Sequence, residues 1–326
     1  MANKILKHVK KFLPLIGIII FFYIIYNLDI EKIKDALLSI SPIFIILSLT
    51  LTIPRVIIRN YAWQLIQKEQ KIKISFFQSL KIFLIGYFYG SITPGYVGQL
   101  MRVPYMKEKT GEPYGKLFVN SVVENIIHTL SLYGMMVIGA LLVIGTIPQL
   151  FTITIIWIII LAIVLFYFIK KERGERLFYV LIKYLIPKSL KSHFNKFVDT
   201  FYTDFPQIKK LIAPLILGLF TWIIIFSQEY IVVLAMGLDI SYVYFLLLFP
   251  IANVAGFIPI TFAGLGVREG TSILIFTTLF AVTQEEILVF TLVGFIITDV
   301  FTGFIGFLLS LTEIRPKNNL STITNI

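Results

Sequence analysis

Long apolar runs, separated by short polar connections, make up most of this chain. Six of these runs are long enough to cross a bilayer as helices, because about 20 apolar residues span its hydrocarbon core. Pro54 lies inside the second run and is expected to kink that helix. The pattern predicts an all-α, polytopic membrane protein with six full transmembrane helices, at residues 12–28, 41–66, 117–144, 151–169, 211–236 and 287–311.

Two further segments, 74–105 and 241–282, contain apolar arms that are short for full spans, with proline and glycine between the arms. Non-helical backbone is tolerated at membrane depth only where protein or a water-filled cavity satisfies its hydrogen bonds. Interrupted apolar segments at corresponding places in two halves are typical of transporters built from inverted repeats. We therefore predict two re-entrant hairpins of opposite orientation. If each arm instead crosses as a thin full span, the chain has up to ten spans.

The charged residues support this class and suggest a topology. Hydrophobic residues make up 57% of the chain and charged residues 14%, whereas soluble domains are about half apolar and a quarter charged. The formal net charge is +11, and the basic residues concentrate in the connections at 68–73, 107–116 and 170–210. Because connections rich in Lys and Arg stay on the cytoplasmic side, we expect a cell-membrane protein with both termini in the cytoplasm. This placement accounts for the charge, and no nucleic-acid partner is inferred.

The chain reads as a single integral membrane domain with an inverted pseudo-repeat. Its central connector holds ten Lys or Arg against four Asp or Glu, with apolar residues at helical spacing. That pattern fits either a helix lying on the bilayer surface or a solvated loop. Within 1–326, the expected parts are a first half at about 1–169 with hairpin 74–105, the connector 170–210, a second half at 211–311 with hairpin 241–282, and a tail at 312–326.

The two interrupted segments share one order of residues. Each has a proline, then small residues, then an arginine eight or nine positions after the proline, Arg102 in the first and Arg268 in the second. Free N–H groups at the ends of broken helices suit an anion, and arginine adds donors that match a phosphate. In the alternative, Arg268 pairs with Glu269 or another carboxylate and only pins the turn. The candidate ligands for an anionic head group are Pro94, Gly98, Arg102, Gly264, Gly266, Arg268 and Glu269.

Polar residues also recur at helical spacing inside the predicted spans. A stripe of three lies four residues apart on the third span, and two arginines lie four apart on the second. A carboxylate inside a membrane is a candidate proton carrier, although such residues more often join helices. The candidates for a coupling or structural network are Asn120, Glu124, His128, Arg55, Arg59, Glu229 and Asp299.

Other chemistries find little support in the sequence. The chain has no cysteine, which excludes disulfides and thiolate chemistry. His8, His128 and His193 are far apart and show no metal-ligand spacing. Neither a nucleophile motif nor a nucleotide-binding loop is present. We therefore expect no catalytic residue, no metal and no cofactor, and no enzymatic activity.

These motifs resemble a flippase-like family of membrane proteins related to the transmembrane flippase region of lysylphosphatidylglycerol synthases. The family's terminal element, Pro-x-x-x-Gly-Gly-x-Gly-x-Arg-Glu-Gly, is matched from Pro259 to Gly270, with Ala263 in place of the first glycine. Its first element is matched by Pro94, Gly98 and Arg102, with Gln99 replacing an acidic residue.

The family's middle element, Glu-Arg-x-x-Asp, keeps only its glutamate here. Glu124 is present, whereas Asn125 and His128 stand where arginine and aspartate are usual. The resemblance covers nearly the whole chain, and no residues remain after the last span for the soluble aminoacyl-transferase domain of the synthases. It therefore implies lipid translocation without head-group chemistry.

Three functions are compatible with the sequence. The first is a translocase that moves an anionic lipid, either a phospholipid or a polyprenyl-phosphate-linked species, between leaflets. The second is a non-transporting membrane partner of a lipid-modifying or glycosyl-transferring enzyme, and the third is a small-anion transporter. The expected partners are membrane lipids, together with a second copy of the chain or such an enzyme.

Overall fold

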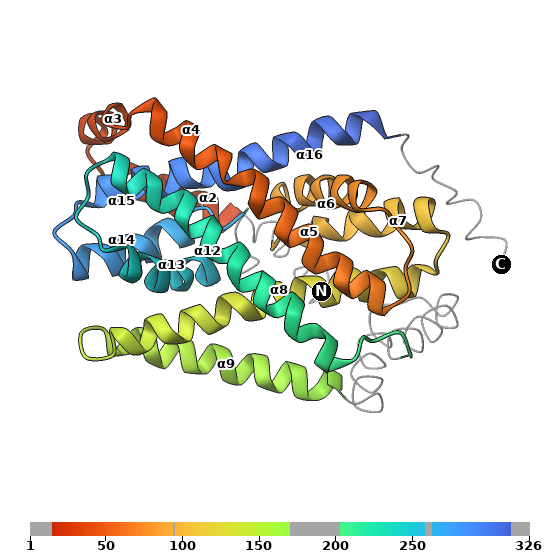
Figure 1. Cartoon of the computed structure of the whole chain (residues 1–326). Coiled ribbons are helices and arrows are strands. Elements are labelled where there is room, and N and C mark those ends of the chain that lie inside the picture. The colour runs from red at the N-terminus through yellow and green to blue at the C-terminus, as the bar shows by residue number, and fades with distance from the viewer. Residues whose placement is uncertain (1–14, 94, 170–202, 258–262, 314–326) are drawn as a thin grey trace, which may run out of the picture.

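The computed structural model describes residues 15–93, 95–169, 203–257 and 263–313, and it contains only helices and turns there (Figure 1). The predicted all-α class is therefore confirmed for this part of the chain. The elements are α2 (Leu15–Tyr26), α3 (Ile30–Leu38), α4 (Pro42–Thr50), α5 (Thr52–Glu69), α6 (Phe76–Ser91), η1 (Val97–Met101), α7 (Arg102–Thr110), α8 (Tyr114–Leu142), α9 (Pro148–Ile169), η3 (Ile208–Leu211), α12 (Ile212–Ala235), α13 (Tyr242–Gly256), α14 (Val267–Leu279), α15 (Gln284–Phe295), η4 (Ile296–Val300) and α16 (Phe301–Thr312).

Four helices in the described residues are long and apolar enough to cross a membrane. They are Pro42–Glu69, Tyr114–Leu142, Ile208–Ala235 and Gln284–Thr312, and each coincides with a predicted span. The span predicted at 151–169 lies in α9, and the described part of 12–28 forms α2. The chain is thus a multi-pass helical membrane protein.

Near Pro54, where a kink is predicted, α4 ends and α5 begins on either side of Leu51. Proline has no N–H group to donate to the carbonyl four residues earlier, so the hydrogen-bond pattern changes there. Leu51 donates its N–H to Ser48, and the pattern resumes where Arg55 donates to Leu51. The long helix therefore continues across the proline and brings Arg55 to its middle.

Two helical hairpins enter the bundle from opposite ends. The first hairpin, formed by α6, η1 and α7, and the second, formed by α13 and α14, lie at opposite ends of the long axis (Figure 1). Their turns meet in the middle, where the rings of Tyr96 and Phe257 lie 6.0 Å apart. Pro94 and Pro259 lie outside the described residues, as do most of the connector 170–210 and the tail beyond Glu313.

Left-handed backbone marks both turns. Gly95 and Tyr96 have positive φ in the first, and Ala263, Gly264 and Gly266 have positive φ in the second. Glycine takes this conformation freely, whereas tyrosine does so at a cost and only where its surroundings hold it. Small residues hold most of these positions, as the sequence pattern indicated, and Tyr96 and Ala263 are the two that take the strained conformation without being glycine.

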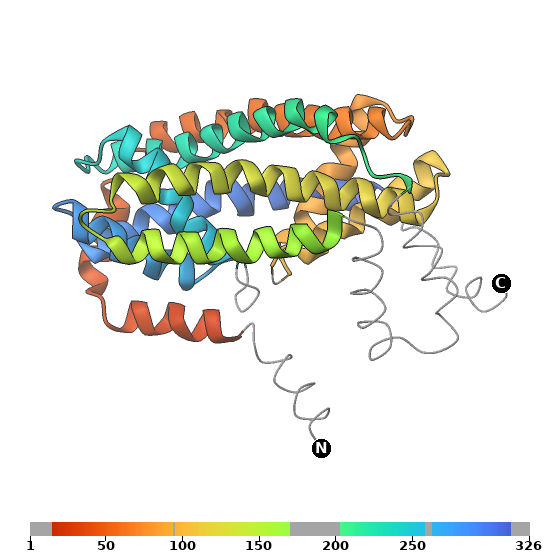
Figure 2. The same cartoon turned by 90° about the horizontal axis from the view of Figure 1, so that it is seen from below.

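Each hairpin packs against the last long helix of the other half. Helix α6 lies along α16, and α13 lies along α8. Glycine permits both close approaches: a Cβ atom on Gly306 would overlap the carbonyl of Leu84, and one on Gly139 would overlap the carbonyl of Leu247. Helix α9 runs beside α8 on the outside of the bundle (Figure 2). The two halves are therefore interlocked around the hairpin turns.

Gly139 gives a direct test of this packing. We expect Gly139→Ala to lower the free energy of unfolding by about 1–3 kcal/mol, because the new methyl group must displace the backbone of α13. Gly134→Ala on the same helix is the control, since nothing lies within 4 Å of its Cβ position. That change is expected to be neutral or to stabilise the helix by up to about 1 kcal/mol. Equal unfolding curves for both variants in mixed detergent micelles would contradict the close α8–α13 contact.

An ion-pair cluster ties the first hairpin to the end of α16. Glu313 lies 2.7 Å from the Lys81 ammonium group and 3.1 Å from that of Lys109. Burial raises the pKa of this carboxyl group, but the hydrogen bonds and charges of the two lysines lower it more, so the pKa lies below its ordinary value. Glu313 is therefore charged at neutral pH and joins α6 and α7 to the last helix.

Candidate functional site

A cavity of about 400 Å³ lies at the middle of the bundle, between the two hairpin turns. Arg55, His128, Trp222 and Thr298 line it, and each lies within one residue of the midpoint of its long helix. Tyr96 and Phe257, the contact between the two turns, also line it. The cavity therefore occupies the depth that is farthest from both ends of all four long helices.

Two arginines on α5 face this cavity, one turn of helix apart. Arg55 donates from Nη2 to the Thr298 carbonyl at 2.8 Å and to the Thr302 hydroxyl, and no carboxylate of the described residues lies within ion-pair distance of it. Arg59 binds Glu124 through Nε at 3.1 Å, and its Nη groups have no hydrogen bond within the described part of the chain. Both guanidinium groups thus keep donors for an anion.

Glu124 does not line the cavity, and it bridges Arg59, which does, to Arg102. Its second oxygen accepts a hydrogen bond from Arg102 Nη1 at 2.8 Å. Arg102 also donates to the carbonyls of Gln99 and Ser121, and its guanidinium group stacks over the ring of Trp63 at 4.7 Å. Only 1% of Arg102 is exposed, and it does not line the cavity.

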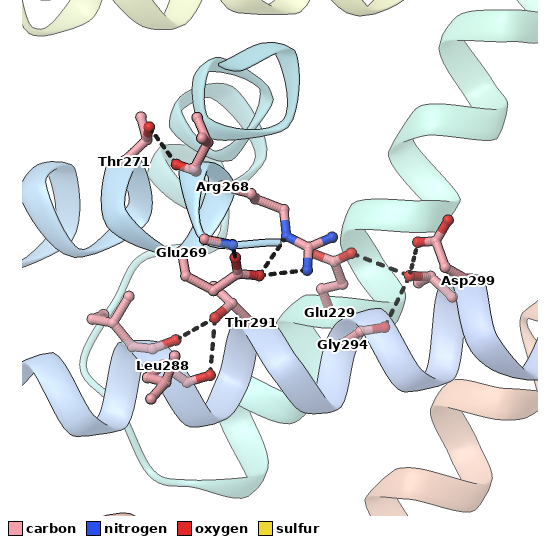
Figure 3. Close-up of polar contacts among 12 residues, drawn as sticks. Glu229, Arg268, Glu269, Thr271, Leu288, Thr291, Gly294 and Asp299 are labelled. Carbon is pink, nitrogen blue, oxygen red and sulfur yellow. Dashed lines mark hydrogen bonds and ion pairs between the residues drawn. The ribbon is translucent and has the colours of Figure 1, made fainter. Parts of the chain in front are cut away.

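Arg268 is similarly enclosed in the second hairpin (Figure 3). Its Nη2 and Nε atoms lie 2.6 and 3.1 Å from Oε1 of Glu269, and the guanidinium group lies over the ring of Phe295. The other oxygen of Glu269 accepts the N–H of Gly266 at 2.5 Å, which satisfies a free donor at the start of α14. These contacts match the alternative given in the sequence analysis, in which Arg268 pairs with Glu269 and fixes the turn.

The prediction that Arg102 and Arg268 bind an anionic head group stays a prediction, and in this structure both side chains are engaged within the protein. Each is buried against a carboxylate, because an isolated charge in this interior would be costly. Gly98, Gly264 and Gly266 serve the turns: a Cβ on Gly98 would overlap the Tyr89 carbonyl, and Gly264 lies against Gly256. The structure thus assigns these residues structural contacts in this state.

Asp299 lies in a π-helical turn, η4, on the cavity wall. Tyr87 and Tyr96 donate their hydroxyl groups to one of its oxygens at 2.8 and 2.9 Å. The Thr298 hydroxyl lies 3.0 Å from the other oxygen and 2.9 Å from the Gly294 carbonyl, and its one proton is shared between these acceptors. Single π-turns inside long helices often occur at functional sites. Here the turn brings Asp299 to hydroxyl groups of the first hairpin, so the last helix and the first turn are joined at the cavity.

Several buried polar atoms of the cavity wall have no protein partner among the described residues. Buried polar groups are normally hydrogen-bonded, so a cluster of exceptions indicates a site for water or a ligand. The ring of His128 stacks on Trp222, with centroids 4.6 Å apart, and leaves both its nitrogens unbonded. The unpartnered atoms that line the cavity are Gln99 Oε1, His128 Nδ1 and Nε2, Glu229 Oε2 and Asn253 Nδ2.

The structure divides the polar candidates of the sequence into two groups. Arg55, Arg59, His128, Glu229 and Asp299 line the cavity. Asn120 and Glu124 lie behind it, where Asn120 accepts from Trp63 and donates to Gln70. Among the described residues no group of acidic and histidine side chains could hold a metal ion. The residues that line the cavity but were not among the sequence candidates include Tyr87, Tyr96, Trp222, Asn253 and Phe257.

Of these missed residues, two gave a usable signal. Tyr96 lies inside the interrupted segment, and Asn253 is a polar residue in an apolar arm. The other side chains are of types that also fill ordinary helix contacts in membranes, so sequence alone does not distinguish them.

Comparison with known proteins identifies the family of the chain. A UPF0104 membrane protein of Methanothermobacter thermautotrophicus is 20% identical over 295 residues, covering 83% of this chain and 86% of the relative. The family model described as the lysylphosphatidylglycerol synthase TM region matches residues 13–306, which include the four long helices almost completely and both hairpins. The chain therefore belongs to the family of the lysylphosphatidylglycerol synthase transmembrane region.

Proposed function

We propose that this protein moves an anionic, phosphate-bearing lipid between the leaflets of the cell membrane. The observation that carries the proposal is the mid-depth cavity, in which Arg55 and Arg59 keep unused guanidinium donors. A head group crossing a bilayer must leave water, and a polar cavity halfway along the long helices lowers that cost. Arginine suits a phosphate because its planar donors match the phosphate oxygens.

The hairpins supply the proposed mechanism. We take each as re-entrant, the first from the cytoplasmic face and the second from the outside, with six full spans and both termini in the cytoplasm. Two features support an inverted repeat of the two halves. The first hairpin packs through α6 on α16, and the second hairpin packs through α13 on α8. Each hairpin arginine also lies beside a glycine of its own hairpin, Arg102 beside Gly86 and Arg268 beside Gly256. Movement of one turn, then the other, away from the cavity would open it to each leaflet alternately.

The arginines of α5 replace the hairpin arginines as head-group ligands in this proposal. Arg102 and Arg268 then have a positioning role outside the cavity, because their contacts hold η1 and the start of α14 in place. The lipid tails stay in the bilayer, and no bond is made or broken. The family match supports a membrane role of this kind, while the specific activity is our proposal.

Reconstituted liposomes test it. We expect the purified protein to move fluorescent phosphatidylglycerol between leaflets, and Arg55→Gln or Arg59→Gln to slow this by about 10–100-fold, the equivalent of a lost charged hydrogen bond of about 1.5–3 kcal/mol. Lys68→Gln removes the same charge from the exposed end of α5 and should leave the rate unchanged.

The same liposomes separate the alternatives. Uptake of inorganic phosphate or sulfate without movement of lipid would favour a small-anion transporter. Movement of neither would favour a non-transporting partner of a lipid-modifying enzyme. Wild-type lipid rates in both arginine variants would remove the cavity from the mechanism.

A further inference from the structure

Charges around the cavity balance in the absence of a ligand. Within the described residues of the bundle's middle, four arginines face four carboxylates, so the net charge of the cluster is zero when all eight side chains are ionised. The members are Arg55, Arg59, Arg102, Arg268, Glu124, Glu229, Glu269 and Asp299. An anionic head group that enters this enclosed space adds an uncompensated negative charge, which a low-dielectric interior strongly disfavours.

Three of the four carboxylates are already occupied. Glu124 binds Arg59 and Arg102, and Glu269 binds Arg268 and the Gly266 N–H. Asp299 accepts the hydroxyl hydrogen bonds of Tyr87 and Tyr96. Each of these three carboxylates therefore already has hydrogen-bond donors within the protein.

Glu229 differs from the other three. It is only 2% exposed, its one hydrogen bond is a long one of 3.4 Å from Thr298, and its Oε2 atom has no partner among the described residues. Gly294 lies against its side chain, where a Cβ would come within 2.8 Å of Glu229 Cγ, so the glycine makes room for Glu229 between the helices. It lines the same cavity as Arg55.

The surroundings of Glu229 contain charges of both signs. Arg55 on α5, Arg268 on α14 and Asp299 on η4 lie close enough to interact with it electrostatically, and His128 on α8 lines the same cavity. Helix α4 has no ionisable residue. The ionisable residues of α13 and α15 (Tyr242, Tyr244, Glu285 and Glu286) lie in the first turns of those helices, away from the cavity.

We infer that Glu229 takes up one proton when an anionic head group binds, so that lipid anion and proton occupy the cavity together. This inference rests on the function proposed above and deepens it: lipid and proton then cross in the same direction. The proton restores the neutrality of the cluster and bonds to a carboxylate oxygen that otherwise has no partner. A sodium ion is disfavoured because it needs several oxygen ligands, whereas a proton needs one.

Calorimetry tests the inference on the intact protein in detergent. Short-chain phosphatidylglycerol is titrated at pH 9 in two buffers of different ionisation enthalpy, which reports the protons taken up per lipid bound. We expect close to one proton for the wild type and close to none for Glu229→Gln, which still binds because glutamine imitates the protonated carboxyl group. Above neutral pH the wild-type affinity should fall tenfold per pH unit, and the variant's should not.

The outcomes separate the inference from the function. Binding without proton uptake, or equal uptake in Glu229→Gln, overturns the inference and leaves lipid translocation standing. A sodium-dependent affinity with no proton uptake also overturns it. Absence of any binding by phosphatidylglycerol and phosphatidate contradicts both. In liposomes, a pH gradient should drive lipid toward the alkaline side in the wild type only.

Discussion

Glu124→Gln is expected to lower the free energy of unfolding by about 3–5 kcal/mol, the usual cost of leaving a buried charge without its partner. Glu124 is 3% exposed and is the one carboxylate within ion-pair distance of both Arg59 and Arg102 in the described residues. Glutamine keeps the shape and one acceptor oxygen, but it offers no negative charge. Arg102, which is almost fully enclosed beside Trp63, would then have only carbonyl oxygens and an aromatic ring around it.

Glu229→Gln is the matched control for this experiment. Both glutamates are buried on long helices, but Glu229 has no ion-pair partner within the described residues. Its replacement by glutamine should therefore be neutral or stabilising. Unfolding of both variants in mixed detergent micelles, followed by circular dichroism, gives the comparison. A Glu124→Gln protein as stable as the wild type would show that solvent reaches Arg102, contrary to the structure.

Arg268→Leu is expected to cost a similar amount, about 3–5 kcal/mol, for the opposite reason. It leaves the Glu269 carboxylate buried with only the Gly266 N–H as a partner. Adding Glu269→Gln should recover most of the loss, because the neutral amide oxygen can still accept that N–H. The double variant also removes the pair as a unit, which often costs little in a well-packed interior.

A double-mutant cycle measures this coupling directly. The free energies of unfolding of Arg268→Leu, Glu269→Gln and the double variant are compared with that of the wild type, and the interaction energy is the departure from additivity. We expect a coupling of at least about 3 kcal/mol, because each single variant leaves a buried charge without its partner and the double variant does not. Additive effects would mean that Arg268 draws its stabilisation from Glu229 or Asp299 instead, which the charges near it also permit.

The predicted elements and the described helices agree because membrane insertion imposes strong local rules. A run of about 20 apolar residues has no other stable conformation in hydrocarbon than a helix, and proline and glycine mark the interruptions. The stripe at Asn120, Glu124 and His128 followed from the helical period. That period also placed Arg55 and Arg59 on one face of α5.

The sequence by itself determined which residues share a face of one helix and where the apolar pattern is broken. Only the tertiary structure decided which faces meet. Arg55 donates to the Thr298 carbonyl, 243 residues away in the sequence, and Asp299 accepts from Tyr87 and Tyr96 of the other half. Charge alone left Arg102, Arg268, Arg55 and Arg59 equivalent, because any of them could bind an anion. Packing distinguishes them. Arg102 and Arg268 are buried against carboxylates, whereas Arg55 and Arg59 line the cavity and keep N–H groups that have no hydrogen-bond partner among the described residues.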